Sequence, residues 1–262
     1  MSLKPPPQWL TAQQARAAQP PRAPRVPLWA GADRIGSVEP ALVDALGLQP
    51  SGVLQPGTQE GEAGWCVVGP VTRALDRLAC ALRDKGLAGA WRNEQLAVTG
   101  PLGQVLGTVE RAAVRPLGIT TFAVHLAGRC PQGNHWIQKR AMDKPNDPGL
   151  WDTLMGGMVP AADTLQAALA RETQEEAGLS LAALQDLRHG GRLMLRKPSG
   201  AHGYLVEQLD WFTCTLPDGV VPVNQDGEVD EFRLMPPPEV LRRLLDDTFT
   251  LEAALVLCAA GL

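Results

Sequence analysis

The sequence predicts an α/β protein in which a small α+β domain precedes a larger domain of strands around a helix. Two changes of pattern along the chain support this prediction. Residues 28–115 combine one amphipathic helix with short strands and many turns, whereas strand-like segments and helices follow one another from residue 119 onwards. With 262 residues, the chain can form one large domain or two small ones. We therefore expect the larger domain to cover residues 116–262.

Residues 1–27 form a Pro/Ala-rich arm with four basic residues and no acidic residue. Because the arm has no continuous hydrophobic region, we interpret it as an extended segment with a short helix at 10–18, and not as a targeting peptide. In the small domain, residues 72–85 are predicted to form an amphipathic helix that ends at Gly86. Strands are expected on both sides of a glycine–proline turn, at 91–98 and 105–109.

The larger domain is predicted to contain four strands and three helices. The strand-like segments are 120–126, 135–140, 204–216 and 229–234. The first helix follows a loop after the second strand, and the other two lie at 239–246 and 251–260.

The first helix of the larger domain ends with three glutamates within five residues. We expect it to begin at Asp163, an N-cap followed three positions later by Gln166, and to end at Gly178. At about 100° per residue, its leucines and glutamates share one side. That side contains Leu165, Ala168, Leu169, Glu172 and Glu176, with Glu175 beside them. The opposite side contains the neutral residues Gln166, Ala167, Ala170 and Gln174.

This glutamate cluster has two interpretations. A run of charges is usually a solvated face, but a solvated face here would also expose Leu165 and Leu169. Three carboxylates near a core repel one another and lose hydration unless a cation neutralises them. Mg²⁺ or Mn²⁺ suits oxygen ligands, and glycine lets a backbone carbonyl come close enough to add one. We therefore favour a metal site. Its expected ligands are Gly156, Glu172, Glu175 and Glu176.

Residues 157–179 resemble the Nudix box, G-x5-E-x7-R-E-U-x-E-E-x-G-U, in which U is a bulky aliphatic residue. The matching positions are Gly157, Arg171, Glu172, Glu175, Glu176, Gly178 and Leu179. Two positions differ, because Asp163 stands where the family has glutamate and Thr173 occupies an aliphatic position. The resemblance implies an α/β/α sandwich with a mixed sheet. It also implies that Arg171 positions the neighbouring glutamates.

Three further charged residues are candidates for the same site. Glu228 follows a glycine at a predicted strand start, and the resemblance implies that a downstream acid completes the metal site or activates water. A polar turn is the alternative for Glu228, and Glu231 is the second choice for the role. Arg140 and Lys144 precede the box and are candidates for holding a diphosphate. A lysine at a strand edge is, however, often only solvated.

Aromatic residues near the box are candidates for stacking on a heterocycle. Trp151 is the substrate-binding candidate, with Trp91 as an alternative, although a tryptophan is more often part of a core. His125 alternates with apolar residues, so we predict a hydrogen-bonded histidine in the core or at a sheet edge.

Composition excludes several classes of protein. The net charge is −4, so the chain lacks the excess of basic residues that is typical of nucleic-acid-binding proteins. The five cysteines are scattered and form no C-x-x-C pair, which argues against a disulfide framework or a zinc site. The longest apolar segment, 251–262, is too short to span a bilayer. We therefore expect a cytoplasmic protein without nucleic-acid or membrane partners, and the oligomeric state stays open.

The resemblance extends over about residues 28–250 to one Nudix subgroup. This subgroup has an N-terminal domain of uncharacterised type and is sometimes fused to thiamine pyrophosphokinase. The segments that carry the resemblance are 90–94, 109–113, 117–119, 124–126, 148–152 and 224–229, together with Arg140, Lys144 and the box. It implies hydrolysis of thiamine diphosphate and, preferentially, of its oxidised analogues to monophosphates.

We therefore expect a Mg²⁺-dependent hydrolase of a diphosphate linked to an organic moiety. The expected catalytic residues are Arg171, Glu172, Glu175 and Glu228. One alternative is a pyrophosphatase for ADP-sugar- or NADH-type substrates. Another is isopentenyl-diphosphate isomerase, which needs a cysteine that Cys130 lies too far upstream to supply. A third is a non-catalytic Nudix-fold binding module, although such modules usually lose box glutamates.

Overall fold

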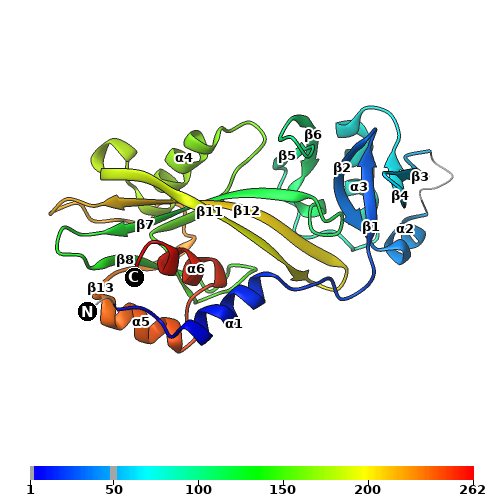
Figure 1. Ribbon diagram of the computed structural model, residues 1–262. Helices are drawn as coiled ribbons and strands as arrows, with labels where there is room; N and C mark the ends of the chain where they lie inside the picture. Colours follow the sequence, from blue (N-terminus) through cyan, green and yellow to red (C-terminus); the bar gives the residue numbers. More distant parts are fainter. Residues whose placement is uncertain (1–2, 48–51) are drawn as a thin grey trace.

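A computed structural model describes residues 3–47 and 52–262, which form two parts (Figure 1). The larger part is a mixed sheet with helices on both faces, and the smaller part lies beside one end of this sheet. Helices on each side of a central sheet bury both of its faces. The structure is therefore the α/β/α sandwich, preceded by a small α+β unit, that the sequence predicts.

The main sheet has seven strands in the order β11-β12-β7-β8-β13, with β10 paired to β7 and β9 paired to β8. The strands are β7 (Thr120–Arg129), β8 (His135–Arg140), β9 (Trp151–Asp152), β10 (Met155–Met158), β11 (Gln185–Ser199), β12 (Gly203–Thr215) and β13 (Val229–Met235). Strands β7 and β12 are parallel, and the other pairs are antiparallel. The four strands predicted from the sequence correspond to β7, β8, β12 and β13.

Alternate residues of β7 face opposite layers of helix. Val124 and Leu126 pack under α4 (Leu165–Ala177), whereas Ala123 and Ala127 face the opposite core. That opposite core is closed by three helices, α1 (Pro7–Ala17), α5 (Pro237–Leu245) and α6 (Leu251–Ala259). A side-chain period of two along a strand produces this division. Both C-terminal helices confirm their predictions to within two residues.

The N-terminal arm is not an extended segment. Helix α1 packs on α6, and its residues Trp9, Leu10 and Ala17 join the core on that face. Pro7 is suited to the first turn, where a missing N–H costs nothing. The helix predicted at 10–18 therefore exists, but the apolar face of α1 draws the arm onto the main sheet.

Strand β11 is the longest strand and was not predicted. It lies at the edge of the sheet, pairs along its length with β12, and leaves most of its side chains exposed. Its polar sequence lacks the apolar run of a central strand. A Cβ on Gly190 would lie 1.8 Å from Cζ3 of Trp211, so glycine is needed there for the strands to pair.

The N-terminal unit has its own sheet, a hairpin and a separate apolar core. Its four-stranded sheet has the order β2-β1-β4-β3. Its elements are β1 (Val26–Ala30), β2 (Asp33–Val38), α2 (Pro40–Leu46), β3 (Leu54–Gln59), β4 (Glu62–Val67), α3 (Val71–Asp84), β5 (Gln95–Thr99), β6 (Val105–Glu110) and the short 3₁₀ helix η2 (Arg111–Ala113).

Helix α3 confirms the helix predicted at 72–85, because Leu75, Leu78 and Leu82 are fully buried in the unit's core. The strand predicted at 91–98 begins only at Gln95. Asn93 has a positive φ of 55°, which breaks an extended segment, and its Oδ1 accepts a hydrogen bond from the Trp91 indole at 2.9 Å.

Candidate active site

The N-cap of helix α4 is Thr164 and not Asp163. Thr164 Oγ1 accepts a hydrogen bond from the Ala167 amide at 3.1 Å. Because the threonine hydroxyl takes this role, the Asp163 carboxylate is free to accept a hydrogen bond from Arg171 Nε at 3.0 Å. The helix ends at Gly178, as predicted, with a left-handed φ of 65°.

Two of the three glutamates of α4 face the sheet, and the third does not. Glu176 is 2% exposed and the Glu172 side chain is 15% exposed, whereas the Glu175 side chain is 47% exposed. The side predicted to face solvent, Gln166, Ala167, Ala170 and Gln174, is exposed. The helical periodicity of the sequence therefore predicts the inward direction of Glu172 and Glu176 correctly. Glu175 lies at the solvent-exposed rim of the site.

The Glu176 carboxylate is held in the interior between α4 and the sheet. Its Oε2 accepts hydrogen bonds from Gln138 Nε2 at 3.0 Å and from the Gly156 amide at 3.1 Å. Burial, reinforced by the nearby Glu172 carboxylate, raises the pKa of Glu176 to about 8. This carboxylate is positioned by neutral donors, and no cation among residues 3–47 and 52–262 is bonded to it directly.

Glu172 lies directly over the glycine strand β10. A Cβ on Gly157 would lie 2.1 Å from Cδ of Glu172, so only glycine leaves room for this carboxylate. Burial raises the pKa of Glu172, although Arg171 opposes the shift. Gly157 pairs with Val124 of β7 and Gly156 with His125, which places β10 beside the central strand.

Arg171 binds three carboxylates of the box region. Its Nη1 lies 3.0 Å from Glu172 Oε1 and 2.8 Å from Glu175 Oε2, while its Nε donates to Asp163. These ion pairs raise the pKa of Arg171 despite partial burial. The side chain therefore orients Glu172 and draws Glu175 towards the rim.

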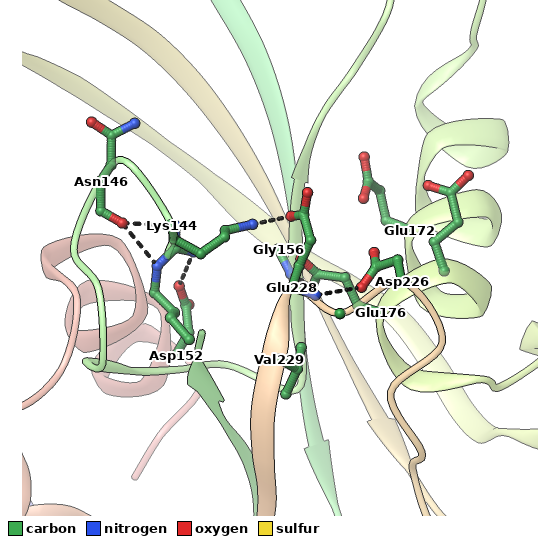
Figure 2. Close-up of polar contacts among 12 residues, drawn as sticks. Lys144, Asn146, Asp152, Gly156, Glu172, Glu176, Asp226, Glu228 and Val229 are labelled. Atoms are coloured by element: carbon green, nitrogen blue, oxygen red, sulfur yellow. Dashed lines mark hydrogen bonds and ion pairs between the residues drawn. The ribbon is translucent and has the colours of Figure 1, made fainter. Parts of the chain in front are cut away.

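Lys144 and Glu228 meet across the mouth of the site (Figure 2). Lys144 Nζ donates to Glu228 Oε2, although Glu228 lies far along the sequence. Burial, opposed by the Glu176 carboxylate, lowers the pKa of Lys144. Asp226 Oδ1 accepts a hydrogen bond from the Glu228 amide at 2.8 Å, and burial raises the pKa of Asp226. The turn before β13 thus brings two more carboxylates near Lys144.

Arg140 extends the basic side of the site. Its Nη1 donates to Asp152 Oδ2 at 3.4 Å, and its Nη2 donates to the carbonyl of Asn146 at 3.1 Å. The Asp152 side chain is 4% exposed. Because these partners fix the guanidinium, Arg140 is a preorganised cation next to Lys144.

The comparison with protein families agrees with this geometry. The model of the NUDIX domain matches residues 121–255, more than half of the chain, including β7, the glycine strand and α4. The chain belongs to the Nudix family.

Two Nudix-related proteins show how far the similarity reaches. Nudix hydrolase 20, chloroplastic, from Arabidopsis thaliana is 34% identical over 173 residues, which are 64% of this chain and 46% of that protein. The chain therefore spans about half the length of this relative. Isopentenyl-diphosphate Delta-isomerase from Streptomyces coelicolor is 29% identical over 161 residues, which are 60% of this chain and 79% of the isomerase.

A solved structure supports the fold. DR0079 from Deinococcus radiodurans superposes with a TM-score of 0.52 at 21% sequence identity, over 64% of this chain and 99% of that chain. At this identity the similarity concerns the arrangement of strands and helices in the Nudix sandwich alone.

Nudix hydrolases generally use divalent metals such as Mg²⁺. The donors of this Nudix box suit such an ion, because burial raises the pKa of both Glu172 and Glu176, and the two carboxylates lie beside the half-buried glycines Gly156 and Gly157. Within 3–47 and 52–262, no three His, Cys, Asp or Glu side chains already have the spacing to hold an ion. Glu175 would have to turn from Arg171 to become a third ligand.

Several candidate residues are not brought to the Nudix box. Trp151 is 6% exposed and packs in the core on the α6 face, with the Arg243 guanidinium 5.0 Å from its ring centroid. The ring therefore has no free face for a heterocycle. Trp91 lies in the N-terminal unit under Arg83, and Glu231 is exposed on β13.

His125 confirms its prediction as a hydrogen-bonded core histidine. It is 7% exposed, and its Nδ1 lies 2.9 Å from Thr153 Oγ1.

The structure adds three polar residues that the sequence interpretation missed. Gln138 and Asp152 are directly paired on β8 and β9, and Asp226 precedes β13. Gln138 stands next to the fully buried Ile137, so a polar residue inside a predicted strand was the available signal. Asp226 was marked only by the Asn-Gln-Asp-Gly turn in which it lies.

Helices within the described ranges all fall short of the length and hydropathy that a bilayer crossing requires.

Proposed function

We propose that this protein hydrolyses a diphosphate that is linked to an organic moiety, with a divalent metal as cofactor. The observation that carries the proposal is the placement of Glu172 and Glu176 against the glycine strand, opposite Lys144 and Arg140. Buried carboxylates close to cations suit a ligand made of metal and phosphate. The full length of the relatives is not covered, so activity is inferred from this site.

The box residues divide into ligands and a positioning group. In this proposal Glu172, Glu175, Glu176 and the carbonyl of Gly156 hold Mg²⁺ or Mn²⁺. A bound ion would supply a more acidic water and stabilise charge on the phosphoryl oxygens. Arg171 holds Glu172 in place and releases Glu175 when a stronger cation is bound.

Lys144, Arg140 and Glu228 are proposed to handle the diphosphate. Lys144 exchanges its contact with Glu228 for a phosphate oxygen, and Arg140 donates from a fixed position. Once it is released, Glu228 can orient a water molecule or accept its proton, because its side chain is 47% exposed. Water then breaks the phosphoanhydride bond, which releases a monophosphate and inorganic phosphate.

We propose oxidised thiamine diphosphate analogues as the substrates, with slower action on thiamine diphosphate itself. The support is the subgroup resemblance outside the box, over 90–94, 109–113 and 224–229. Nucleoside diphosphate derivatives are the alternative substrates, because a metal, two cationic side chains and an apolar wall would bind them equally well. The proposal includes a small-molecule substrate and no nucleic-acid partner.

The deciding experiment compares kcat/KM for thiamine diphosphate, its oxidised analogues, ADP-ribose, NADH and nucleoside triphosphates, with Mg²⁺ and with a chelator. We expect phosphate release from the oxidised analogues that the chelator abolishes. A tenfold preference for any nucleotide, about 1.4 kcal/mol in transition-state binding, would exclude the thiamine assignment. Absence of turnover across the panel, together with tight ligand binding, would instead indicate a binding module.

Isomerisation of isopentenyl diphosphate is a second candidate because of the Streptomyces coelicolor relative. That chemistry needs a cysteine at the site. Cys130 follows the far end of β7, five residues beyond His125, or about 17 Å along an extended strand. Incubation with isopentenyl diphosphate should therefore give no dimethylallyl diphosphate.

A further inference from the structure

A groove of about 570 Å³ lies where the N-terminal unit meets the main sheet. One wall comes from β2 and the turn between β5 and β6, and the floor comes from β7, β11 and β12. A volume of this size accommodates a small organic molecule. The groove is lined by both parts of the chain, so the N-terminal unit is a wall of the site and not a spacer.

The two walls of the groove are held in a fixed relation. The Ser37 amide donates to the Leu117 carbonyl at 2.9 Å, and a Cβ on Gly36 would lie 2.4 Å from that oxygen. The buried guanidinium of Arg25 donates to the carbonyls of Ser37, Pro116 and His202. These bonds join the N-terminal unit to β7 and to the β11–β12 turn. The groove is therefore preorganised.

The groove and the Nudix box are neighbours along β7. Phe122 lines the groove, and its carbonyl accepts a hydrogen bond from the amide of Val159, just after the glycine strand. Val124, two residues further along β7, is the register partner of Gly157, over which Glu172 lies. Two residues of an extended strand span about 7 Å. A molecule with its diphosphate at Glu172 therefore reaches the groove with its other end.

The side chains that line the groove favour a ligand that has hydrogen-bond acceptors and no positive charge. Among the lining residues that the structure describes, two are arginines, Arg34 and Arg196, and none is acidic. Arg34 has an exposed ion pair with Glu62 at 3.4 Å, whereas Arg196 makes no ion pair within the described ranges. Asp33 is not among these lining residues; its Oδ1 would lie 3.0 Å from a Cβ on Gly100 and accepts a hydrogen bond from Gln104 at 3.0 Å.

Aromatic surface completes this lining. Phe122 and Tyr204 project from neighbouring strands into the groove, and the Tyr204 hydroxyl is already used as a donor to the Gln19 carbonyl. A planar ring would pack on these side chains while its acceptors meet the arginines. A cationic ring would lose hydration beside Arg196 without gaining a counter-charge.

We propose that the groove between the N-terminal unit and the sheet binds the organic end of the substrate, and that Arg196 and Arg34 select a ring with hydrogen-bond acceptors and no positive charge. This inference rests on the proposed function, since it takes the diphosphate to lie at the Nudix box. It makes the N-terminal unit a determinant of specificity.

The test uses two compounds that differ in charge but hardly in shape, thiamine diphosphate and its neutral 2-oxo analogue. In the full-length Arg196→Met variant, the ratio of kcat/KM for the neutral over the cationic compound should fall at least tenfold, mainly through KM. Arg196→Lys should restore part of the preference, and Arg34→Met should lower it less, because Glu62 already pairs with Arg34. The matched control is Arg188→Met, which removes a 74% exposed arginine from the same strand and should leave the ratio unchanged.

Calorimetric binding of the two monophosphates to the same variants separates this inference from the proposed function. If the wild-type protein hydrolyses neither compound, the function proposal fails, while selective binding that Arg196→Met removes still supports the groove. If Arg196→Met and the double variant with Arg34→Met leave both the kinetic ratio and the binding preference unchanged, the groove does not hold the organic end.

Discussion

Glu110 in the N-terminal unit and Glu176 in the Nudix half are both almost completely buried, at 1% and 2% exposure. Glu110 Oε1 accepts hydrogen bonds from the backbone amides of Arg92 and Ala112, at 3.0 and 3.4 Å. It thereby organises the chain around the 3₁₀ helix that follows β6. Glu176 also accepts two hydrogen bonds, but it lies beside a second carboxylate, and its pKa is raised to about 8.

The difference separates a carboxylate that stabilises the fold from one that the fold tolerates. A buried charge satisfied by backbone amides replaces the water that it loses. A buried charge beside another charge of the same sign does not recover the hydration that it loses. Such positions are typical of functional sites. The N-terminal unit therefore uses its buried acid for folding, whereas the Nudix half buries a carboxyl group whose raised pKa favours the neutral form in the absence of a cation.

Replacing Glu176 should have the largest effect and should affect activity alone. Glu176→Gln keeps the size and an oxygen that can accept both present hydrogen bonds, but it removes the carboxylate that we propose as a metal ligand. We expect kcat/KM for the best diphosphate substrate to fall about a thousandfold, about 4 kcal/mol in transition-state stabilisation. The free energy of unfolding should change by less than about 1 kcal/mol.

Phosphate release and urea unfolding measured on the same preparation test this prediction. The control is Gln174→Glu, which adds a carboxylate to the exposed side of α4 and should leave both quantities close to wild type. Full activity in Glu176→Gln would remove this residue from the ligand set.

Acid should destabilise the Nudix half through His135. This side chain is 2% exposed, and its Nδ1 has no hydrogen-bond partner within the described ranges. Burial, with Arg129 nearby, lowers the pKa of His135 from 6.5 to about 4. The unfolded chain therefore binds a proton first as pH falls. Stability should decline between pH 6.5 and 4, by roughly 3 kcal/mol at most.

Urea unfolding as a function of pH measures this decline. His135→Gln should flatten the slope between pH 6.5 and 4, whereas His202→Gln, which removes a 46% exposed imidazole, should retain it. Identical slopes in wild type and His135→Gln would show that another group governs the acid limb.

Removing Glu110, the buried acid of the N-terminal unit, should lower stability and leave activity unchanged, whereas Glu176→Gln should do the reverse. Glu110→Ala leaves the Arg92 and Ala112 amides without their acceptor, which should lower the free energy of unfolding by about 2 kcal/mol. Activity of the folded fraction should persist, because this carboxylate does not reach the Nudix box. A variant with normal stability but no activity would reverse the comparison.

The smallest expected effect concerns the start of α4. Thr164→Ala removes the N-cap hydrogen bond to Ala167 and should cost about 1 kcal/mol of stability. Asp163→Ala should cost less stability, because Asp163 is bonded to Arg171 and not to the helix amides. Thermal unfolding of both variants distinguishes them, and a larger loss in Asp163→Ala than in Thr164→Ala would restore Asp163 as the cap.

Local spacing was sufficient to predict helix α4, its end at Gly178 and the inward direction of Glu172 and Glu176. These features depend on the helical repeat, which relates residues three or four positions apart and needs no knowledge of the rest of the chain. The strands β7, β8, β12 and β13 were predicted for a similar reason, because strand-forming residues follow one another within each short segment.

Tertiary contacts decided the features that join distant segments. Trp151 is buried because α5 and α6 cover its face of the sheet. The edge strand β11, the contact between Lys144 and Glu228 and the groove between the two parts depend on strand register and on the docking of the N-terminal unit. No spacing along the chain encodes such distances, because each arises from segments that meet only when both cores are packed.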